Sequence, residues 1–162
     1  MSSNFRAANS LPSNIDGAGV RVGLVCGRWN DDITNRLIEG AEYALAVHGV
    51  AEADVIQVWV PGAYEAPMAA KGLIDSGKVD VVVCLGAVIR GETSHYDFVA
   101  GECARGIMDV QLATGVPVIF GVLTTENLEQ ALSRSSEEDN KGEECVRTGL
   151  EMVNLLRSLA KK

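Results

Sequence analysis

The sequence of 162 residues has little of what metal centres and disulfide frameworks require. Its two histidines are His48 and His95, so a histidine-rich zinc site is not expected, and we predict no bound metal. The four cysteines lack paired metal-type spacing, and Cys26 and Cys84 lie in apolar runs typical of buried free thiols. The amino-terminal residues lack the basic-then-apolar pattern of a signal peptide. Together these features favour a reducing, cytoplasmic location.

Long apolar runs and several catalytic signatures are also absent. No apolar segment is long enough to span a bilayer, so no membrane partner is expected. No Gly-x-Gly-x-x-Gly follows the first predicted strand and no Gly-x-Ser-x-Gly occurs, which leaves dinucleotide binding and serine hydrolysis without support. Residues 72–78 have the spacing of a phosphate-binding P-loop, but Val79 stands where that motif needs a hydroxyl group. We interpret Gly77 as the end of a helix instead.

Positive charge is scarce, with 14 Lys and Arg against 22 Asp and Glu and a net charge of -8. This balance argues against a nucleic-acid partner, whereas local amides and one arginine suffice to bind a phosphate. The 47% hydrophobic and 22% charged content is typical of a globular protein. We expect a flexible amino-terminal arm over residues 1–19 and a single domain over residues 20–162.

Apolar runs and helical periodicity alternate along the chain. Strands are predicted at residues 20–26, 54–60, 80–89 and 118–123, and helices at 31–48, 63–76, 94–114, 124–132 and 143–159. This alternation predicts an α/β protein, a flavodoxin-like three-layer α/β/α sandwich with a short, mainly four-stranded parallel sheet. The helical side chains expected in its core are Ile33, Leu37, Ala41, Leu45, Phe98, Ile107, Met108, Leu112, Val146, Leu150, Val153 and Leu156.

The most informative stretch is residues 85–97, Leu-Gly-Ala-Val-Ile-Arg-Gly-Glu-Thr-Ser-His-Tyr-Asp. It follows residues 79–84, an apolar run typical of a strand buried on both faces, and it precedes a long helical pattern. It is therefore predicted to be a strand-to-helix turn at the carboxyl end of a central strand. Ligands bind at that edge of open α/β sheets.

The chemistry of this turn suits an anion and a proton transfer. The amides of Glu92 and Thr93 are expected near the positive end of the helix, where a phosphate binds well. Ser94 and Asp97 have capping-box spacing. His95 then lies in the first turn, where a neutral imidazole is favoured and can exchange a proton near neutral pH. The alternative is a helix cap with a surface histidine.

Other candidate residues follow the neighbouring strands. Trp29 and Asn30 follow the first strand, and an indole there either stacks on a planar ligand, contributing ~1–3 kcal/mol, or packs on the first helix. Glu65 follows the second strand and is either a hydrogen-bond acceptor for a polyol or a favourable charge at a helix start. Phe120 in the fourth strand is a core or a site residue, and Arg134 is a surface charge or a phosphate partner.

Taken together, these loops resemble the lumazine synthase family, whose members make 6,7-dimethyl-8-ribityllumazine in riboflavin biosynthesis. The resemblance extends over about residues 20–159, and its matching segments are residues 60–65, 85–97, 114–124, 129–132 and 140–142. It implies a cofactor-independent condensation of 5-amino-6-(D-ribitylamino)uracil with 3,4-dihydroxy-2-butanone 4-phosphate. It also implies a homo-oligomer, either a pentamer or a pentamer-based shell, with a riboflavin synthase as a candidate partner.

The resemblance also implies residue roles. Trp29 would stack on the pyrimidine beside Asn30, and His95 would transfer protons. Phe120 and Arg134 would reach the site from a neighbouring subunit, as an aromatic wall and a phosphate ligand. The remaining implied contacts are Ala63, Tyr64 and Glu65 for the ribityl chain, Ala87, Val88 and Ile89 for the pyrimidine edge, Glu92 and Thr93 for the phosphate, and Lys141 nearby.

One loop departs from the family pattern. The family often has Arg-Ala-Gly and a basic residue before Asn-Lys-Gly, whereas here Arg134 is followed by Ser-Ser-Glu-Glu-Asp. Two other hypotheses remain open from the residues. One is a non-catalytic module that binds a flavin or a ribityl compound, and the other is a purely structural shell protein.

Overall fold

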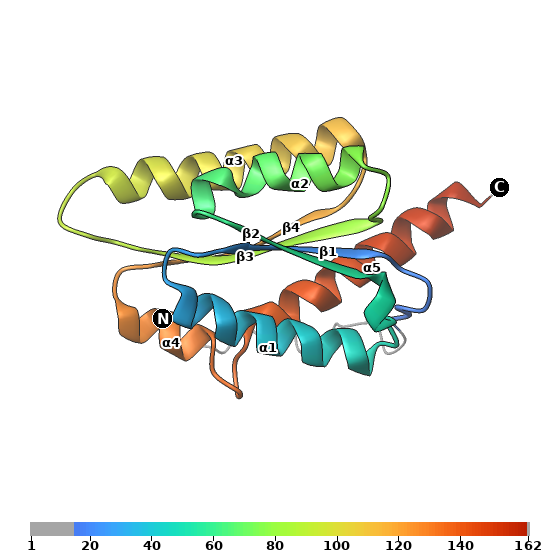
Figure 1. The fold of residues 1–162 in the computed structure, drawn as a ribbon, viewed down its shortest axis with the longest axis horizontal. Coiled ribbons are helices and arrows are strands. Elements are labelled where there is room, and N and C mark those ends of the chain that lie inside the picture. The colour runs from blue at the N-terminus through green and yellow to red at the C-terminus, as the bar shows by residue number, and fades with distance from the viewer. Residues whose placement is uncertain (1–14, 162) are drawn as a thin grey trace.

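The computed structural model describes residues 15–161 and contains one parallel sheet (Figure 1). Its strand order is β2-β1-β3-β4, so the chain crosses over once between the edge strand β2 and the inner strand β3. This confirms the predicted α/β fold with a four-stranded parallel sheet. The strands are β1 (Val22–Gly27), β2 (Val55–Val60), β3 (Val81–Ile89) and β4 (Val118–Thr125).

Helices cover both faces of this sheet, with α2 and α3 on one side and α1, α4 and α5 on the other (Figure 1). Their bounds are α1 (Asp31–Val47), α2 (Ala66–Asp75), α3 (His95–Thr114), α4 (Leu128–Arg134) and α5 (Lys141–Ala160), with single 3₁₀ turns η2 (Glu52–Asp54) and η3 (Ala63–Glu65). Each predicted helix is present, and Gly77 ends α2 with a φ of 71° as expected.

Two helix starts differ from the prediction because of asparagine caps. The fourth helix begins at Leu128, because β4 continues to Thr125 and the side chain of Asn127 accepts a 2.9 Å hydrogen bond from the amide of Gln130. The last helix begins at Lys141, where the side chain of Asn140 accepts from the amides of Gly142 and Glu143. A side-chain acceptor at this position satisfies amides that the helix itself leaves unpaired.

Strand β3 is the centre of the sheet. It pairs with β1 from Val81 to Leu85 and with β4 from Val82 to Ile89, and its first seven residues are buried. Alternate side chains point to opposite faces, so β3 contributes to both helix layers. The prediction of a strand buried on both faces is therefore confirmed.

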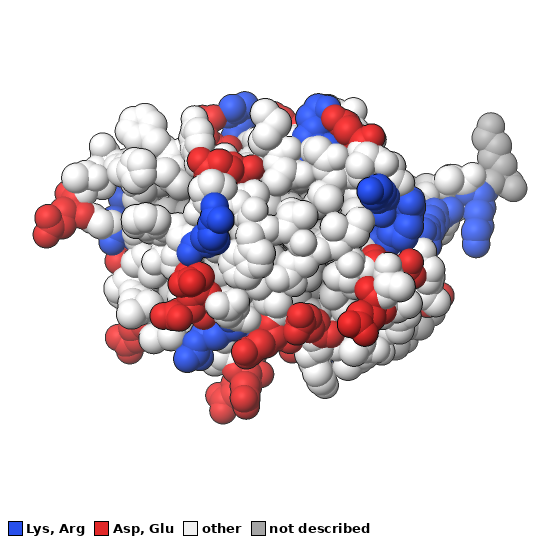
Figure 2. Space-filling view, viewed as in Figure 1, with Lys and Arg blue, Asp and Glu red and all other residues white. Residues whose placement is uncertain are grey.

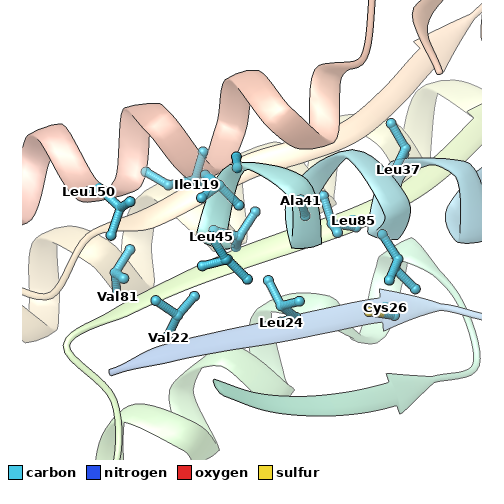
Figure 3. Close-up of a cluster of buried hydrophobic side chains, with 14 of the residues drawn as sticks. Val22, Leu24, Cys26, Leu37, Ala41, Leu45, Val81, Leu85, Ile119 and Leu150 are labelled. Atoms are coloured by element: carbon cyan, nitrogen blue, oxygen red, sulfur yellow. The ribbon is translucent and has the colours of Figure 1, made fainter. Parts of the chain in front are cut away.

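The larger hydrophobic core lies between the sheet and helices α1 and α5 (Figure 3). The side chains of Leu24 and Leu85 from the sheet meet those of Leu37 and Leu150 from the helices, and each is at most 1% exposed. The predicted inner stripe of α1 is confirmed, because Ile33, Leu37, Ala41 and Leu45 are all buried. A second core lies under α2 and α3 and includes Val82, Cys84, Cys103 and Ile107.

The predicted core face of α3 is wrong at three positions. Phe98, Met108 and Leu112 are 67%, 50% and 73% exposed, whereas Ile107 and Cys103 are buried. Helix α3 carries apolar side chains on more than one side, and the sheet covers only one of them. Leu156 in α5 is likewise 39% exposed, because α5 runs on beyond the sheet (Figure 1).

All four cysteines are free thiols, and the expected burial of Cys26 and Cys84 is confirmed. Burial raises the pKa of the Cys26 thiol to about 12 and that of Cys103 to about 11. Because the thiolate is the reactive form of cysteine, these groups act as small apolar side chains at neutral pH.

The segment before β1 is described only from residue 15, so residues 1–14 of the expected arm lie outside the described residues. The amide of Gly17 donates a 2.9 Å hydrogen bond to the carbonyl of His48. The amide of Asp16 donates to Asn154 Oδ1 at 3.0 Å, and Asn154 Nδ2 donates to the carbonyl of Asp16 at 2.8 Å. Residues 15–17 are thus tied to the end of α1 and to α5.

Helices α1 and α5 approach each other closely at the Asn-Lys-Gly segment. Asn140 Nδ2 donates a 2.9 Å hydrogen bond to the carbonyl of Arg36 in α1, while its Oδ1 caps α5. A Cβ at Gly142 would overlap the carbonyl oxygen of Leu37, so the crossing leaves no room for a side chain there. This contact gives the segment a structural role at the start of α5.

We expect Gly142→Ala to destabilise the fold, because the added methyl must push α5 away from α1. Overpacking of this kind typically costs about 1–3 kcal/mol. Urea unfolding measures the change. The matched control is Gly72→Ala in α2, where nothing lies within 4 Å of the added Cβ and no loss of stability is expected. If Gly142→Ala and Gly72→Ala had equal free energies of unfolding, this would contradict the close approach of α1 and α5 at Gly142.

Candidate active site

A cavity of about 580 Å³ opens at the carboxyl ends of β1, β2 and β3. It lies where the sequence predicted a ligand site, because the loops after parallel strands meet at one edge of a sheet. The predicted site residues that line it are Trp29, Ala63, Tyr64, Glu65, Ala87, Val88, Ile89, Thr93 and His95. Gly62 and Gly91, which lie in loops that the sequence pointed to, also line it, whereas sequence reasoning did not single out Pro61, Tyr96, Phe98 or Val99 as lining residues.

The indole of Trp29 forms an open aromatic wall of the cavity. It is 76% exposed, so it does not pack into the core with α1. Two backbone hydrogen bonds hold its loop beside the next one, from the amide of Arg28 to the carbonyl of Val60 at 2.9 Å and from the amide of Trp29 to the carbonyl of Pro61 at 3.1 Å. The ring is therefore presented on an ordered loop and is available to stack on a planar ligand.

Asn30, the next residue in this loop, does not line the cavity. Its φ of 62° makes it the non-glycine residue with a left-handed backbone within the described residues. Its Nδ2 donates a 3.0 Å hydrogen bond to the carbonyl of Ala87, which joins the loop after β1 to the end of β3. The structure thus gives Asn30 a supporting role for a cavity residue.

The second wall is the turn after β2. It begins with Gly62, whose carbonyl accepts a 3.3 Å hydrogen bond from the amide of Glu65. A Cβ at Gly62 would lie 3.5 Å from Glu65 Oε2 and 3.8 Å from the Cβ of Trp29. The exposed carboxylate of Glu65 is therefore folded back towards the aromatic wall, where it can accept hydrogen bonds from hydroxyl groups of a ligand.

Helix α3 begins at His95, directly after the predicted cap Ser94, but the capping box is wrong. Ser94 has helical φ and ψ of -71° and 0°, and its side chain makes no capping hydrogen bond. A capping serine needs an extended backbone to reach the amides of the first turn. Thr93 Oγ1 accepts a 3.3 Å hydrogen bond from the amide of His95 instead, and Asp97 pairs with Arg90.

Further polar groups of the cavity lie at this helix start. Thr93 and His95 line the cavity and are exposed, while Glu92 is exposed but does not line it. Unpaired amides at a helix start attract anions, and an accessible imidazole can exchange protons with a ligand. One side of the cavity thus suits an anion, next to an aromatic and apolar side that suits a planar ring.

Besides Asn30 and Glu92, three further predicted site residues lie outside this cavity. Phe120 is 39% exposed on the edge strand β4, and Arg134 is exposed at the end of α4. Lys141 Nζ lies 2.6 Å from Glu144 Oε2 and 3.6 Å from Asp139 Oδ1. Within a single chain, the fold does not bring these side chains to the cavity.

Across residues 15–161, no group of three His, Cys, Asp or Glu side chains is arranged to hold a metal ion. In the same part of the chain, no helix is both long and apolar enough to cross a membrane.

A comparison with protein-family models connects this geometry to known proteins. The family model described as 6,7-dimethyl-8-ribityllumazine synthase matches residues 19–157. The match includes every strand, every loop that lines the cavity, and the segments that carry Phe120, Arg134 and Lys141.

We expect Asn30→Ala to lower the free energy of unfolding more than Asn30→Gly does. Both variants lose the hydrogen bond to Ala87, but only alanine is strained at a positive φ, by roughly 1–2 kcal/mol. Urea unfolding of both variants measures the difference. An alanine variant as stable as the glycine variant would show that the left-handed conformation at Asn30 is not required.

Proposed function

Because the chain belongs to the 6,7-dimethyl-8-ribityllumazine synthase family, we propose that it condenses 5-amino-6-(D-ribitylamino)uracil with 3,4-dihydroxy-2-butanone 4-phosphate. The observation that supports this most is the composition of one cavity. An exposed indole, an exposed carboxylate, a strand end and a helix start with a histidine all line it. A planar pyrimidine, its polyol chain and a phosphate ester need these four kinds of partner.

In this proposal the pyrimidine stacks on Trp29, and its polar edge hydrogen-bonds to the backbone of Ala87, Val88 and Ile89. The half-buried end of β3 suits that contact, because Val88 and Ile89 lie at the cavity wall. The ribityl hydroxyl groups donate to Glu65 and pack along Ala63 and Tyr64. The phosphate of the ketone binds at the start of α3, to Thr93 and the amide of Glu92.

The reaction then follows from this arrangement. The 5-amino group attacks the ketone, and loss of water gives an imine. Phosphate leaves by elimination, and the enol left at the neighbouring hydroxyl-bearing carbon tautomerises to a carbonyl. The ribityl-bearing nitrogen closes the ring on this new carbonyl with loss of a second water. His95 lies at the cavity wall beside the phosphate-binding turn, where it can accept and return the protons of these steps.

Positioning supplies more of the rate than the histidine does in this mechanism. Holding two substrates in reacting geometry contributes ~7–11 kcal/mol, whereas one acid–base group typically contributes ~10²–10⁴-fold. The walls of the cavity are held by backbone hydrogen bonds between neighbouring loops, which suits a site that acts by orientation.

We further propose that the site is completed by a second copy of the chain, which supplies Phe120, Arg134 and Lys141. The apolar surface of the α2–α3 layer supports an oligomer, because Met68, Phe98 and Leu112 are each at least 67% exposed. Figure 2 shows a broad uncharged area on one face, with acidic side chains along its lower margin over α1. Several large apolar side chains exposed on one layer are typical of a subunit contact.

The cavity and Arg134 lie on different parts of one chain, so the proposed contact joins two different surfaces. A contact between two different surfaces, called heterologous, forms a ring when the rotation from one subunit to the next closes. The resemblance implies such a ring, a pentamer that stands alone or belongs to a larger shell. A riboflavin synthase is a candidate partner, because it uses the product of this reaction.

The test is an assay of the purified protein with both substrates and no added cofactor or metal. We expect lumazine fluorescence and free phosphate to grow together, well above the uncatalysed rate. Tight binding of riboflavin without any acceleration would contradict the proposal and favour a non-catalytic ribityl-binding module.

We expect His95→Ala to lower kcat about 10²–10⁴-fold without abolishing turnover, since one proton-transfer group is lost and positioning remains. Steady-state kinetics measure this, and His48→Ala at the end of α1 is the matched control that keeps the wild-type rate. Wild-type turnover in His95→Ala would remove this residue from the mechanism.

We expect Arg134→Glu to raise the KM for the phosphorylated ketone by tenfold or more. Hydrogen bonds to charged groups contribute about 1.5–3 kcal/mol, and the reversed charge also repels the phosphate. The KM for the pyrimidine should change little. The control is Lys78→Glu, an exposed charge at the opposite edge of the sheet. An unchanged KM for the ketone in Arg134→Glu would exclude it as the phosphate ligand.

A further inference from the structure

Arg90 links three segments around the cavity, although it is not among the cavity-lining residues. It directly follows β3, and its amide donates a 2.9 Å hydrogen bond to the carbonyl of Thr125 at the end of β4. Its guanidinium donates from Nε to Glu126 Oε2 at 2.9 Å and from Nη2 to Asp97 Oδ1 at 3.2 Å. The same group lies 4.1 Å from the centre of the Tyr96 ring.

The turn that Arg90 precedes has few other anchors. Residues 91–95 are all exposed, and the connection from β3 to α3 extends beyond the sheet at the left of Figure 1. In the described chain, the hydrogen bonds of residues 91–94 are made within the turn and the first residues of α3, by His95 with Thr93 and by Asp97 with Ser94. The position of the turn therefore depends on its two ends.

Arg90 joins those two ends to each other and to the neighbouring strand. Its backbone belongs to the strand side of the turn, and Tyr96 and Asp97 belong to the helix side. The guanidinium thus closes residues 91–95 into a short loop and fastens this loop to the β4–α4 link through Glu126. Closing a loop at both ends reduces the conformational freedom that a ligand must otherwise remove on binding.

We propose that Arg90 is a positioning residue, which fixes the turn 91–95 and the ring of Tyr96 so that the anion end of the substrate meets a preformed site. This rests on the proposed function and deepens it. Arg90 itself is not the anion ligand, because its guanidinium already pairs with two carboxylates. The flat guanidinium meets two carboxylates and an aromatic face at once, which a lysine ammonium does not reproduce.

The test compares Arg90→Met and Arg90→Lys with the wild type. For Arg90→Met we expect the KM for the phosphorylated ketone to rise about tenfold or more, with a smaller change for the pyrimidine, because small displacements of a binding group have large effects. Arg90→Lys keeps the positive charge but only part of the guanidinium geometry. Its KM for the phosphorylated ketone should therefore lie between that of the wild type and that of Arg90→Met.

Arg21→Met is the matched control. Arg21 pairs with Asp80 through Nη2 at 2.8 Å and Nε at 3.1 Å, and its Nη1 donates to the carbonyl of Gly77, at the opposite edge of the sheet. Its removal should lower stability and leave both KM values unchanged. Equal effects of Arg21→Met and Arg90→Met on KM would overturn the proposal, since general destabilisation would then explain both.

A second readout does not depend on the reaction. Hydrogen exchange of the amides in residues 91–96, measured without substrates, should be faster in Arg90→Met than in the wild type and unchanged in Arg21→Met. Unchanged exchange would overturn the role of Arg90. A wild-type protein without turnover would overturn the proposed function alone, because the exchange result still decides whether Arg90 holds the turn.

Should Arg90→Met fail to fold, Glu126→Gln removes the link to the β4–α4 segment at a carboxylate that is 61% exposed. We expect a smaller rise in the KM for the ketone and an intermediate exchange rate. If Glu126→Gln kept the wild-type KM for the ketone and the wild-type exchange rate, the proposal would be overturned.

Discussion

The arrangement of the whole site depends on the burial of strand β3. It pairs with β1 on one edge as far as Leu85 and with β4 on the other as far as Ile89, and its first seven residues are buried. Its carboxyl end is therefore held in place by β4 and by the buried part of the strand. The loops that line the cavity are then tied to that end or to each other, by Asn30 to Ala87, by Arg28 to Val60 and by Arg90 to Thr125. A rigid strand with hydrogen-bonded loops suits catalysis by orientation, in which the walls must hold two substrates without rearranging.

Much of the fold and part of the site could be predicted from the sequence, because both follow from topology. Alternating strands and helices imply a parallel sheet, and a parallel sheet brings Trp29, Glu65 and His95 to one edge although they are far apart in the chain. The prediction of a capping box was wrong because the spacing of two residues in the sequence does not reveal which other side chains compete for them. Arg90, seven residues before Asp97, takes the carboxylate that the motif assigned to the helix start. Tyr96 was missed for the same reason, since its place beside Arg90 is a tertiary contact.

The incorrect core residues of α3 have a different cause. An apolar side chain indicates that a surface is to be buried, but it does not indicate whether the same chain or another one covers it. Phe98, Met108 and Leu112 remain exposed in one chain, and Phe120 and Arg134 lie away from the cavity that they are proposed to complete. The proposed second copy would account for both features, because one contact would cover the apolar helix face and add the missing aromatic and cationic groups.

The most direct test of this shared site is the activity of mixed oligomers. His95→Ala and Arg134→Glu chains, each with low activity alone, are unfolded together in equal amounts and refolded. If the two residues act from different chains, random mixing leaves about a quarter of the contacts with both side chains intact, so we expect about a quarter of the wild-type rate to return. A mixture no more active than the average of its two components would contradict a site built from two chains.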